Sequence, residues 1–389
     1  RNERQAAMAG PARTQVLLLG AGRVGSAIAR DLAGDFDVTV ADTSAPMLAR
    51  LDGVAGVRPV QASVTDPAAL GPLLERAQLV VGAVPGPLGF ETLRRVLEAG
   101  RDIVDISFFE QDAFELDELA RRQGRVAIVD CGVAPGCSNL ILGRHAATME
   151  RVDRFWCAVG GLPEERTWPY EYKAPFSPID VIAEYNRPAR FRRGGQDVTL
   201  PALSEIELVD LPGVGTVEAF NTDGLRSLLH TVPVPEMVEK TLRYPGHAER
   251  MRMLRESGFF DETPVTIGAT AVRPIDLTTR LLFDAWSYQP GERDLTVMRV
   301  IVEGIEDGAP VRHTYDLLDR YDVPSDTSSM ARTTGYTCTA AVRLLASGHV
   351  VRPGITPPER LGVAATDFIF ADLARHGVSF RYEKMGGRG

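Results

Sequence analysis

The feature that most limits the fold is a glycine motif between an apolar run and a helical stretch. Residues 16–19 form the run, and residues 24–32 have helical spacing. The motif consists of Gly20, Ala21, Gly22, Arg23, Val24 and Gly25. In this context the first glycine permits a tight turn, the second lets a pyrophosphate approach the backbone, and the third lets helix and strand pack closely. The motif predicts a Rossmann-type dinucleotide site that includes all six residues.

The rest of the first third repeats one pattern. Short apolar runs alternate with segments of helical period, and the clearest runs are residues 16–19, 38–41, 79–83, 103–106 and 126–129. This alternation is typical of a parallel sheet with crossover helices on both faces. We therefore predict an α/β fold with a doubly wound parallel sheet in a first domain, residues 13–138, and a ligand site at the carboxyl edge of its strands.

An acidic residue at the end of the second run bears on the choice of cofactor. Asp42 lies about 20 residues beyond the first glycine, where a carboxylate can bond the ribose hydroxyls and repel the extra phosphate of NADP. We predict NAD as the cofactor, although a solvated strand end is an alternative for Asp42. By their position after later strands, we also expect the following residues to contact the cofactor: Ser63, Val64, Ala83, Val84, Pro85 and Ser107.

Beyond residue 138 the pattern changes to longer strands and polar loops, which predicts a second, α+β domain over residues 139–348. Residues 295–304 and 311–317 form a hairpin signal around Asp307 and Gly308. We expect residues 349–389 to return to the first domain as a helix and a strand. Helices are predicted at residues 235–242, 247–256, 275–283, 328–346 and 364–376.

Composition excludes several classes of protein. The 389 residues carry a net charge of −9, which disfavours binding to nucleic acid or anionic lipid. No apolar run approaches the roughly 18 residues of a membrane span, so we expect no membrane partner and a cytoplasmic location. Met8 is the expected natural start. Four cysteines without C-x-x-C spacing are expected to be free thiols, and six histidines without ligand spacing predict no metal site.

Several motifs together carry a family resemblance. Besides the glycine motif, they are Asp105-Ile106-Ser107 and the stretches at residues 130–140, 160–163 and 241–247. Their succession resembles the saccharopine dehydrogenase family over nearly the whole chain. The resemblance implies a bilobal enzyme whose second domain binds an amino-acid substrate and forms the interface of a homodimer.

Within that family, residues 218–225 resemble the lysine 6-dehydrogenase branch. Ala134 and Val159 depart from the pattern of the glutamate-forming enzymes. The resemblance implies NAD-dependent oxidation of the ε-amine of L-lysine to a semialdehyde that closes to a cyclic imine. Saccharopine dehydrogenase and carboxynorspermidine-type dehydrogenase stay open as alternatives, as does a non-catalytic NAD-binding sensor.

Candidate substrate residues follow from charge and position. Arg243 is expected to hold the substrate carboxylate because its guanidinium can bind in bidentate fashion, with a structural salt bridge as the alternative. Asp223 can hold the α-ammonium and Asp130 can lie near the nicotinamide, unless either serves a turn. The remaining candidates, which we expect near the reacting amine as catalytic residues, are Tyr172, Lys173 and His247. For these, ordinary surface positions and helix capping are the alternatives.

Overall fold

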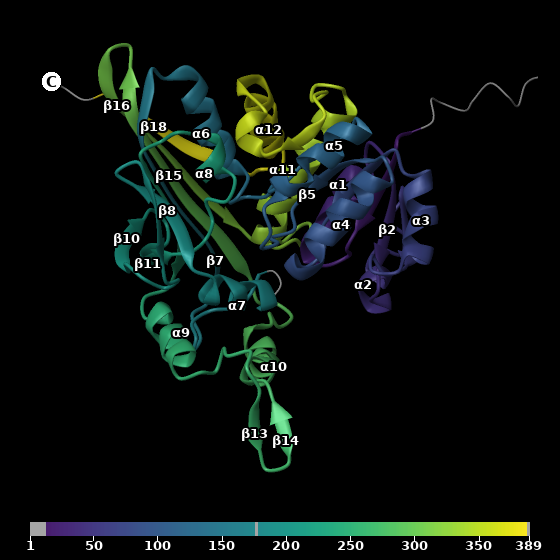
Figure 1. The fold of residues 1–389 in the computed structure, drawn as a ribbon, viewed down its shortest axis with the longest axis horizontal. Coiled ribbons are helices and arrows are strands. Elements are labelled where there is room, and N and C mark those ends of the chain that lie inside the picture. Colours follow the sequence, from purple (N-terminus) through teal and green to yellow (C-terminus); the bar gives the residue numbers. More distant parts are fainter. Residues whose placement is uncertain (1–12, 176–177, 387–389) are drawn as a thin grey trace, which may run out of the picture.

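The first sheet of the computed structural model, which describes residues 13–175 and 178–386, is a seven-stranded parallel sheet (Figure 1). The expected start at Met8 lies outside the described residues. In spatial order the strands are β17 (Gly354–Thr356), β6 (Val126–Ile128), β5 (Asp102–Asp105), β4 (Leu79–Gly82), β1 (Gln15–Leu19), β2 (Asp37–Asp42) and β3 (Val57–Gln61). The helices that follow these strands are α1 (Arg23–Leu32), α2 (Ala45–Ala49), α3 (Pro67–Arg76), α4 (Gly86–Glu98) and α5 (Asp117–Gln123), with a 3-10 turn η1 (Ala113–Leu116).

Alternate residues of β1 bury against helices on opposite faces of the sheet. Val16 and Leu18 belong to the core cluster that includes residues of α1, whereas Leu17 and Leu19 belong to the cluster that includes residues of α3 and α4. Because side chains alternate across a strand, an unbroken apolar run requires cover on both faces. The predicted Rossmann-type, doubly wound sheet is confirmed.

The chain reverses its winding between β1 and β4, which are neighbours in the sheet. β1 continues outward to β2 and β3, and β4 continues in the other direction to β5 and β6. Ligands of doubly wound sheets bind beyond the carboxyl ends of the strands at such a reversal. The fold thus places the glycine motif at a binding crevice.

The second sheet is mixed and has nine strands. Its main path runs β10 (Glu207–Leu211), β11 (Gly215–Asn221), β12 (Glu236–Arg243), β7 (Arg151–Pro163), β15 (Asp294–Glu306), β16 (Ala309–Arg320) and β18 (Phe380–Gly386). Off this path, β8 (Ala189–Arg193) pairs with β12, and β9 (Gln196–Leu200) pairs with β8. The helices of this part are α6 (Cys137–Thr148), α7 (Pro178–Asn186), α8 (Leu228–Thr231), α9 (His247–Glu256), α10 (Pro274–Trp286), α11 (Ser329–Ala346) and α12 (Val363–Arg375), with a 3-10 turn η2 (Pro358–Arg360). A small hairpin, β13 (Val265–Ile267) and β14 (Thr270–Val272), projects from the body with α10 (Figure 1).

Most of the predicted elements of the second part are confirmed. β15 and β16 form the predicted hairpin, and Asp307 and Gly308 have the positive φ angles of a tight turn. The helices predicted near residues 247, 275, 328 and 364 are α9, α10, α11 and α12. The helix predicted at residues 235–242 is wrong, because this segment is β12, paired on one side with β11 and on the other with β7.

The last segment of the chain is shared by the two sheets. β17 pairs with β6 in the first sheet, whereas β18 pairs with β16 in the second sheet. The strand that we expected to return to the first domain therefore extends the other sheet. Boundaries near residues 138 and 348 are kept as a proposed division of the chain.

No helix within the described ranges is long and apolar enough to cross a membrane.

Candidate active site

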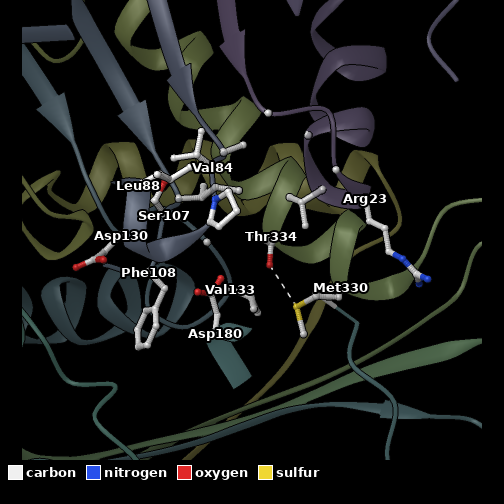
Figure 2. Close-up of a pocket in the computed structure, with 18 of the residues that line it drawn as sticks. Arg23, Val84, Leu88, Ser107, Phe108, Asp130, Val133, Asp180, Met330 and Thr334 are labelled. Atoms are coloured by element: carbon white, nitrogen blue, oxygen red, sulfur yellow. Dashed lines mark hydrogen bonds between the residues drawn. The ribbon is translucent and has the colours of Figure 1, made fainter. Parts of the chain in front are cut away.

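A cavity of about 610 Å³ lies at the carboxyl edge of the first sheet and reaches the second domain. This volume is in the range of small-molecule and cofactor sites. Figure 2 shows Arg23 on one side of the cavity and Asp130 on the other. We call the side that contains the glycine motif and Asp42 the nucleotide end, and the side that contains Asp130 and Arg243 the substrate end.

The three glycines of the motif serve two different needs. A Cβ on Gly20 would lie 2.3 Å from the carbonyl oxygen of Ala83, and a Cβ on Gly25 would lie 2.2 Å from that of Gly20. These two positions require glycine for backbone packing. A Cβ on Gly22 would meet no protein atom within 4 Å, because Gly22 faces the cavity at the N-terminus of α1. The space beside Gly22 suits a pyrophosphate held by backbone N–H groups.

Most residues expected to contact the cofactor line the cavity. The lining includes Gly20, Gly22, Arg23, Val24, Gly25, Asp42, Ser63, Val64, Ala83, Val84, Pro85 and Ser107. Ala21 is buried and does not line it, but its N–H donates to the Asp42 carboxylate over 2.7 Å. The second Asp42 oxygen accepts from the N–H of Ser44 over 2.8 Å. These bonds hold the Asp42 carboxylate at the nucleotide end.

Carboxyl groups dominate the substrate end. Five of them line the cavity: Asp130, Asp180, Glu184, Asp223 and Glu239. The basic residues in the described lining are Arg23, at the nucleotide end, and Arg243. An acidic wall of this kind favours a ligand that carries positive charge.

Two of these carboxylates are neutralised by arginines behind the wall. Asp130 accepts from Arg226 Nε at 2.8 and 2.9 Å, and both side chains are buried. Asp223 accepts from Arg190 through Nε at 2.9 Å and Nη2 at 2.8 Å. We expected both acids to face substrate; they line the cavity, but their charges are already paired.

Arg243 extends from β12 between two tyrosines. Its Nε donates to the hydroxyl of Tyr185 over 3.1 Å, and its guanidinium lies 4.4 Å from the ring centre of Tyr172. Glu184 is 3.7 Å from Nη2. These contacts fix the guanidinium plane at the cavity wall, where its position agrees with a role in binding a carboxylate.

Two carboxyl groups of the substrate end have raised pKa values. Burial raises the pKa of Glu184 to about 7, although the nearby Arg243 opposes the change. Burial, followed by repulsion from Glu184, Asp130 and Asp223, raises the pKa of Glu239 to about 8. A cationic ligand would favour the ionised form of both groups.

The three residues expected near the reacting amine do not line the cavity. Tyr172 is buried behind Arg243. His247 bonds the hydroxyl of Tyr185 and the carbonyl of Tyr170, and burial together with Arg243 lowers its pKa to about 3. Lys173 donates to Glu292 over 2.6 Å. Tyr172 and His247 thus support the Arg243 side chain, while Lys173 forms an ion pair with Glu292.

Sequence reasoning missed Asp180, Glu184 and Glu239. Asp180 and Glu184 are four residues apart on α7, a spacing that puts both on one helix face. Glu239 and Arg243 share one face of β12, and Thr241 between them also lines the cavity. Polar residues alternate at positions 239, 241 and 243, a pattern that is typical of one face of a strand. The helix predicted at residues 235–242 is incompatible with this pattern.

Within residues 13–175 and 178–386, no group of three or more histidine, cysteine or carboxylate side chains is arranged to hold a metal ion.

Comparison with known proteins covers both domains. The family model described as the saccharopine dehydrogenase NADP binding domain matches residues 16–128, and the model of the saccharopine dehydrogenase C-terminal domain matches residues 132–378. The first domain is therefore a pyridine-nucleotide-binding domain of this type.

Individual relatives are distant, and they differ in how much of the chain they cover. The NADP(+), L-glutamate-forming saccharopine dehydrogenase of Schizosaccharomyces pombe is 23% identical, covering 95% of this chain and 98% of its own. The carboxynorspermidine synthase of Vibrio cholerae is 24% identical over 49% of this chain and 48% of its own. The apo structure of the L-Glu forming saccharopine dehydrogenase from Saccharomyces cerevisiae has the same fold, with a TM-score of 0.78 at 21% identity over 96% of this chain and 100% of that one. With both of its domains matched in order, the chain belongs to the saccharopine dehydrogenase family.

Proposed function

We propose that the protein is an NAD-dependent dehydrogenase that oxidises the carbon bearing the ε-amine of L-lysine. The observation that carries this proposal is the acidic substrate end, which adjoins the nucleotide end in one cavity and has Arg243 as its basic group. L-Lysine has two ammonium groups and one carboxylate, so its charges complement a wall of acids with a single arginine.

The chemistry requires a neutral amine. An ammonium with a reference pKa of about 10.4 has no lone pair to assist loss of hydride from the adjacent carbon. The cavity therefore has to remove a proton before oxidation. Bound NAD⁺ would supply the acceptor for the hydride. Water hydrolyses the resulting iminium to a semialdehyde and releases ammonium. The semialdehyde then closes on its own α-amine, with loss of water, to a cyclic imine.

Arg243 is proposed to anchor the substrate carboxylate. It is held against Tyr172 and Tyr185, so little side-chain freedom remains to be lost on binding. Asp130 and Asp223 cannot offer the same attraction to an ammonium as free carboxylates, because Arg226 and Arg190 already bond them.

NAD is proposed over NADP because of Asp42. The family model and the named relatives refer to NADP. In this chain the neighbours of Asp42 in the cavity lining are Thr43, Ser44 and Met47, none of which offers a positive charge to a ribose phosphate. A fixed carboxylate at this place would repel that phosphate.

Saccharopine dehydrogenase is the second candidate, favoured by the names of the relatives. Saccharopine carries two carboxylates more than lysine, and these need cationic partners. Arg226 lies beside the cavity-lining Asp130, but its guanidinium already donates to Asp130 and to the carbonyl of Phe109. Unpaired carboxylates buried in this cavity would cost several kcal/mol each. Carboxynorspermidine-type activity is a third candidate, through the Vibrio relative.

A spectrophotometric assay of NADH formation tests the proposal. L-Lysine, saccharopine, carboxynorspermidine and cadaverine are compared at alkaline pH, and lysine is expected to be the best substrate. Arg243→Ala should lower kcat/KM for lysine by roughly 10- to 150-fold, which corresponds to a loss of about 1.5–3 kcal/mol of transition-state stabilisation, and should affect cadaverine less because it has no carboxylate.

The outcome of this assay separates the candidates. Faster turnover of saccharopine than of lysine would replace the lysine proposal with the second candidate. NADH binding without turnover of any amine would indicate a non-catalytic sensor. Homodimer formation and a cytoplasmic location also stay predictions, and sedimentation analysis of the purified protein checks the first of them.

A further inference from the structure

Glu239 has an unusual position in the cavity wall. It lies on β12 and is 5% exposed, and its Oε2 is buried without a hydrogen-bond partner in the described part of the chain. A buried carboxyl oxygen without a partner costs free energy and is seldom retained without a role. Glu239 lines the cavity, so a ligand bound there can reach this carboxyl group.

The backbone of the facing loop makes room for this carboxyl group. A Cβ added to Gly224 would lie 2.1 Å from Oε1 of Glu239. Gly224 has an ordinary φ angle, so its lack of a side chain is required by the closeness of Glu239 and not by a turn. The loop after β11 and the strand β12 therefore together fix the Glu239 carboxyl at the cavity.

The other acids at the substrate end have partners that limit their use as proton acceptors. Arg226 bonds Asp130 and Arg190 bonds Asp223. Glu184 lies 3.7 Å from Arg243, and Asp180 accepts from the N–H of Gly86 over 3.2 Å. At Asp130, Asp180 and Asp223 these donors already use carboxylate oxygens that would otherwise accept a proton, and Glu184 lies beside the arginine proposed to anchor the substrate carboxylate.

We propose that Glu239 is the catalytic base, the group that accepts the proton from the substrate ammonium before hydride transfer. This inference rests on the proposed function and adds to it the residue that the sequence did not identify. An N–H bond of the ammonium breaks and an O–H bond forms on Glu239. The freed lone pair of the amine can then form the C=N bond as hydride leaves the adjacent carbon, and bound NAD⁺ would be the acceptor of that hydride. Glu239 returns its proton to solvent after product release.

The charges around Glu239 match this task. Burial and neighbouring acids raise the pKa of Glu239 to about 8, which makes it a stronger base than an ordinary carboxylate. The titratable and charged groups that face it are Glu184 on α7, Asp130 after β6, Asp223 after β11, Arg226 before α8 and the free thiol of Cys157, which lies opposite Glu239 on the neighbouring strand β7. Arg226 is the one cation among these groups and is bonded to Asp130.

The pH profile of kcat/KM for lysine distinguishes Glu239 from a structural residue. The wild-type profile should rise with an inflection near the Glu239 pKa of about 8, because the carboxylate is the active form. Glu239→Gln should lower kcat/KM by about 100-fold or more at pH 8. Its remaining activity should keep rising toward the amine pKa of about 10.4, because only neutral amine is then productive.

Glu236→Gln is the matched control. Glu236 lies on the same strand, outside the cavity lining, and its carboxylate accepts from Gly194 N–H, a bond that an amide oxygen can keep. This variant should retain the inflection near pH 8. Should Glu239→Gln not fold, as judged by NADH binding, Glu239→Asp carries the test, since a carboxylate one methylene shorter should keep the inflection at a reduced rate.

Thermal unfolding of wild type and Glu239→Gln from pH 5 to pH 9 tests the raised pKa of Glu239 without any substrate. The folded pKa of Glu239 is raised above its unfolded value, so folded wild type binds a proton that the unfolded chain has lost. The stability contributed by that proton is full below the unfolded pKa of about 4.3 and is lost as pH rises through the folded pKa. The difference between the Tm of Glu239→Gln and that of wild type should therefore shift in favour of the variant as pH rises from 5 to 8. Above pH 8 this difference should no longer change.

The two proposals can fail separately. A wild-type enzyme that oxidises no amine overturns the proposed function whatever Glu239 does. An active wild type whose Glu239→Gln variant keeps its rate within about threefold and its inflection near pH 8 overturns the role of Glu239 alone. A Tm difference that does not change with pH would also count against Glu239, because the carboxyl would then lack the basicity that the role requires.

Discussion

At the scale of single residues, the chemistry of each acid in the cavity depends on its partner. Asp130, Asp223 and Glu239 lie in one wall, yet arginines bond the first two, and no arginine among the described residues bonds the third. The same side chain can therefore be a fixed structural anion or a proton acceptor. Charge alone, as the sequence presents it, does not distinguish these roles.

Asp42 gives the residue-scale prediction on cofactor choice. Asp42→Ala removes the carboxylate that the N–H groups of Ala21 and Ser44 hold at the nucleotide end. We expect kcat/KM with NAD to fall by roughly 5- to 150-fold, which corresponds to about 1–3 kcal/mol, and the preference for NAD over NADP to shrink, because the repulsion of the 2′-phosphate is lost.

Kinetics with both nucleotides check this prediction. Asp37→Ala is the control, since Asp37 begins the same strand and does not line the cavity. Wild-type enzyme that uses NADP as well as NAD would show that Asp42 has no part in the choice.

At the scale of elements, a helix or strand could be predicted from the sequence where local residues determine it, and could not be predicted where distant pairing determines it. Apolar runs predict the buried parallel strands of the first sheet because both faces of each strand are covered. β12 could not be predicted in this way. Its sequence Glu236–Arg243 is rich in helix formers, and its pairing with β7 and β11 prevails over that local preference.

The same distinction explains the candidate site. The nucleotide end is built from short loops that follow predicted strands, so its residues could be found by position. The substrate end depends on pairs far apart in the sequence, such as Arg226 with Asp130, 96 residues apart, and Arg190 with Asp223, 33 apart. No local sequence pattern predicts which carboxylate forms an ion pair with which arginine.

The turn between β1 and α1 gives the element-scale prediction. Gly22→Ala places its methyl group in the cavity and meets no protein atom, whereas Gly25→Ala places it 2.2 Å from the carbonyl oxygen of Gly20. Gly22→Ala should weaken NADH binding at least tenfold with Tm unchanged. Gly25→Ala should weaken binding and also lower stability by about 1–3 kcal/mol, because α1 must move from β1.

Fluorescence titration with NADH and thermal unfolding without nucleotide check this pair of variants. If the two variants lost stability equally, the division of the glycines into one for the ligand and one for packing would be wrong. If Gly22→Ala bound NADH as wild type does, the pyrophosphate would have to lie elsewhere.

At the scale of the whole molecule, the cavity belongs to neither domain alone. The glycine motif and Asp42 come from the first domain, while Glu184, Glu239 and Arg243 come from the second. The reacting carbon and the nicotinamide meet correctly only if the two domains keep a fixed relation. α11 contributes to this relation, because Cys338, Ala341 and Val342 pack into the core of the first sheet.

The buried pair Asp130 and Arg226 joins the two domains beside the cavity and gives the last prediction. Asp130 follows β6, and Arg226 comes from the loop before α8, stacks on Phe108 and donates to the carbonyl of Phe109. Arg226→Met should cost about 3–5 kcal/mol of unfolding free energy because it leaves a buried carboxylate without a partner. Asp130→Asn should cost a similar amount because it leaves the buried Arg226 guanidinium without a carboxylate partner. Asparagine tolerates the left-handed backbone at this position, where φ is 54°.

The double variant separates the pair from its surroundings. With both charges removed, no buried ion is left unpaired, so Asp130→Asn with Arg226→Met should be more stable than the sum of the single losses predicts. Urea unfolding of the wild type, the single variants and the double variant measures this coupling. The exposed pair Glu118 and Arg122 is the control, and its charge removal should cost under about 1 kcal/mol. Additive losses at Asp130 and Arg226 would mean that the two domains are held together by other contacts, and that the position of the substrate end does not depend on this ion pair.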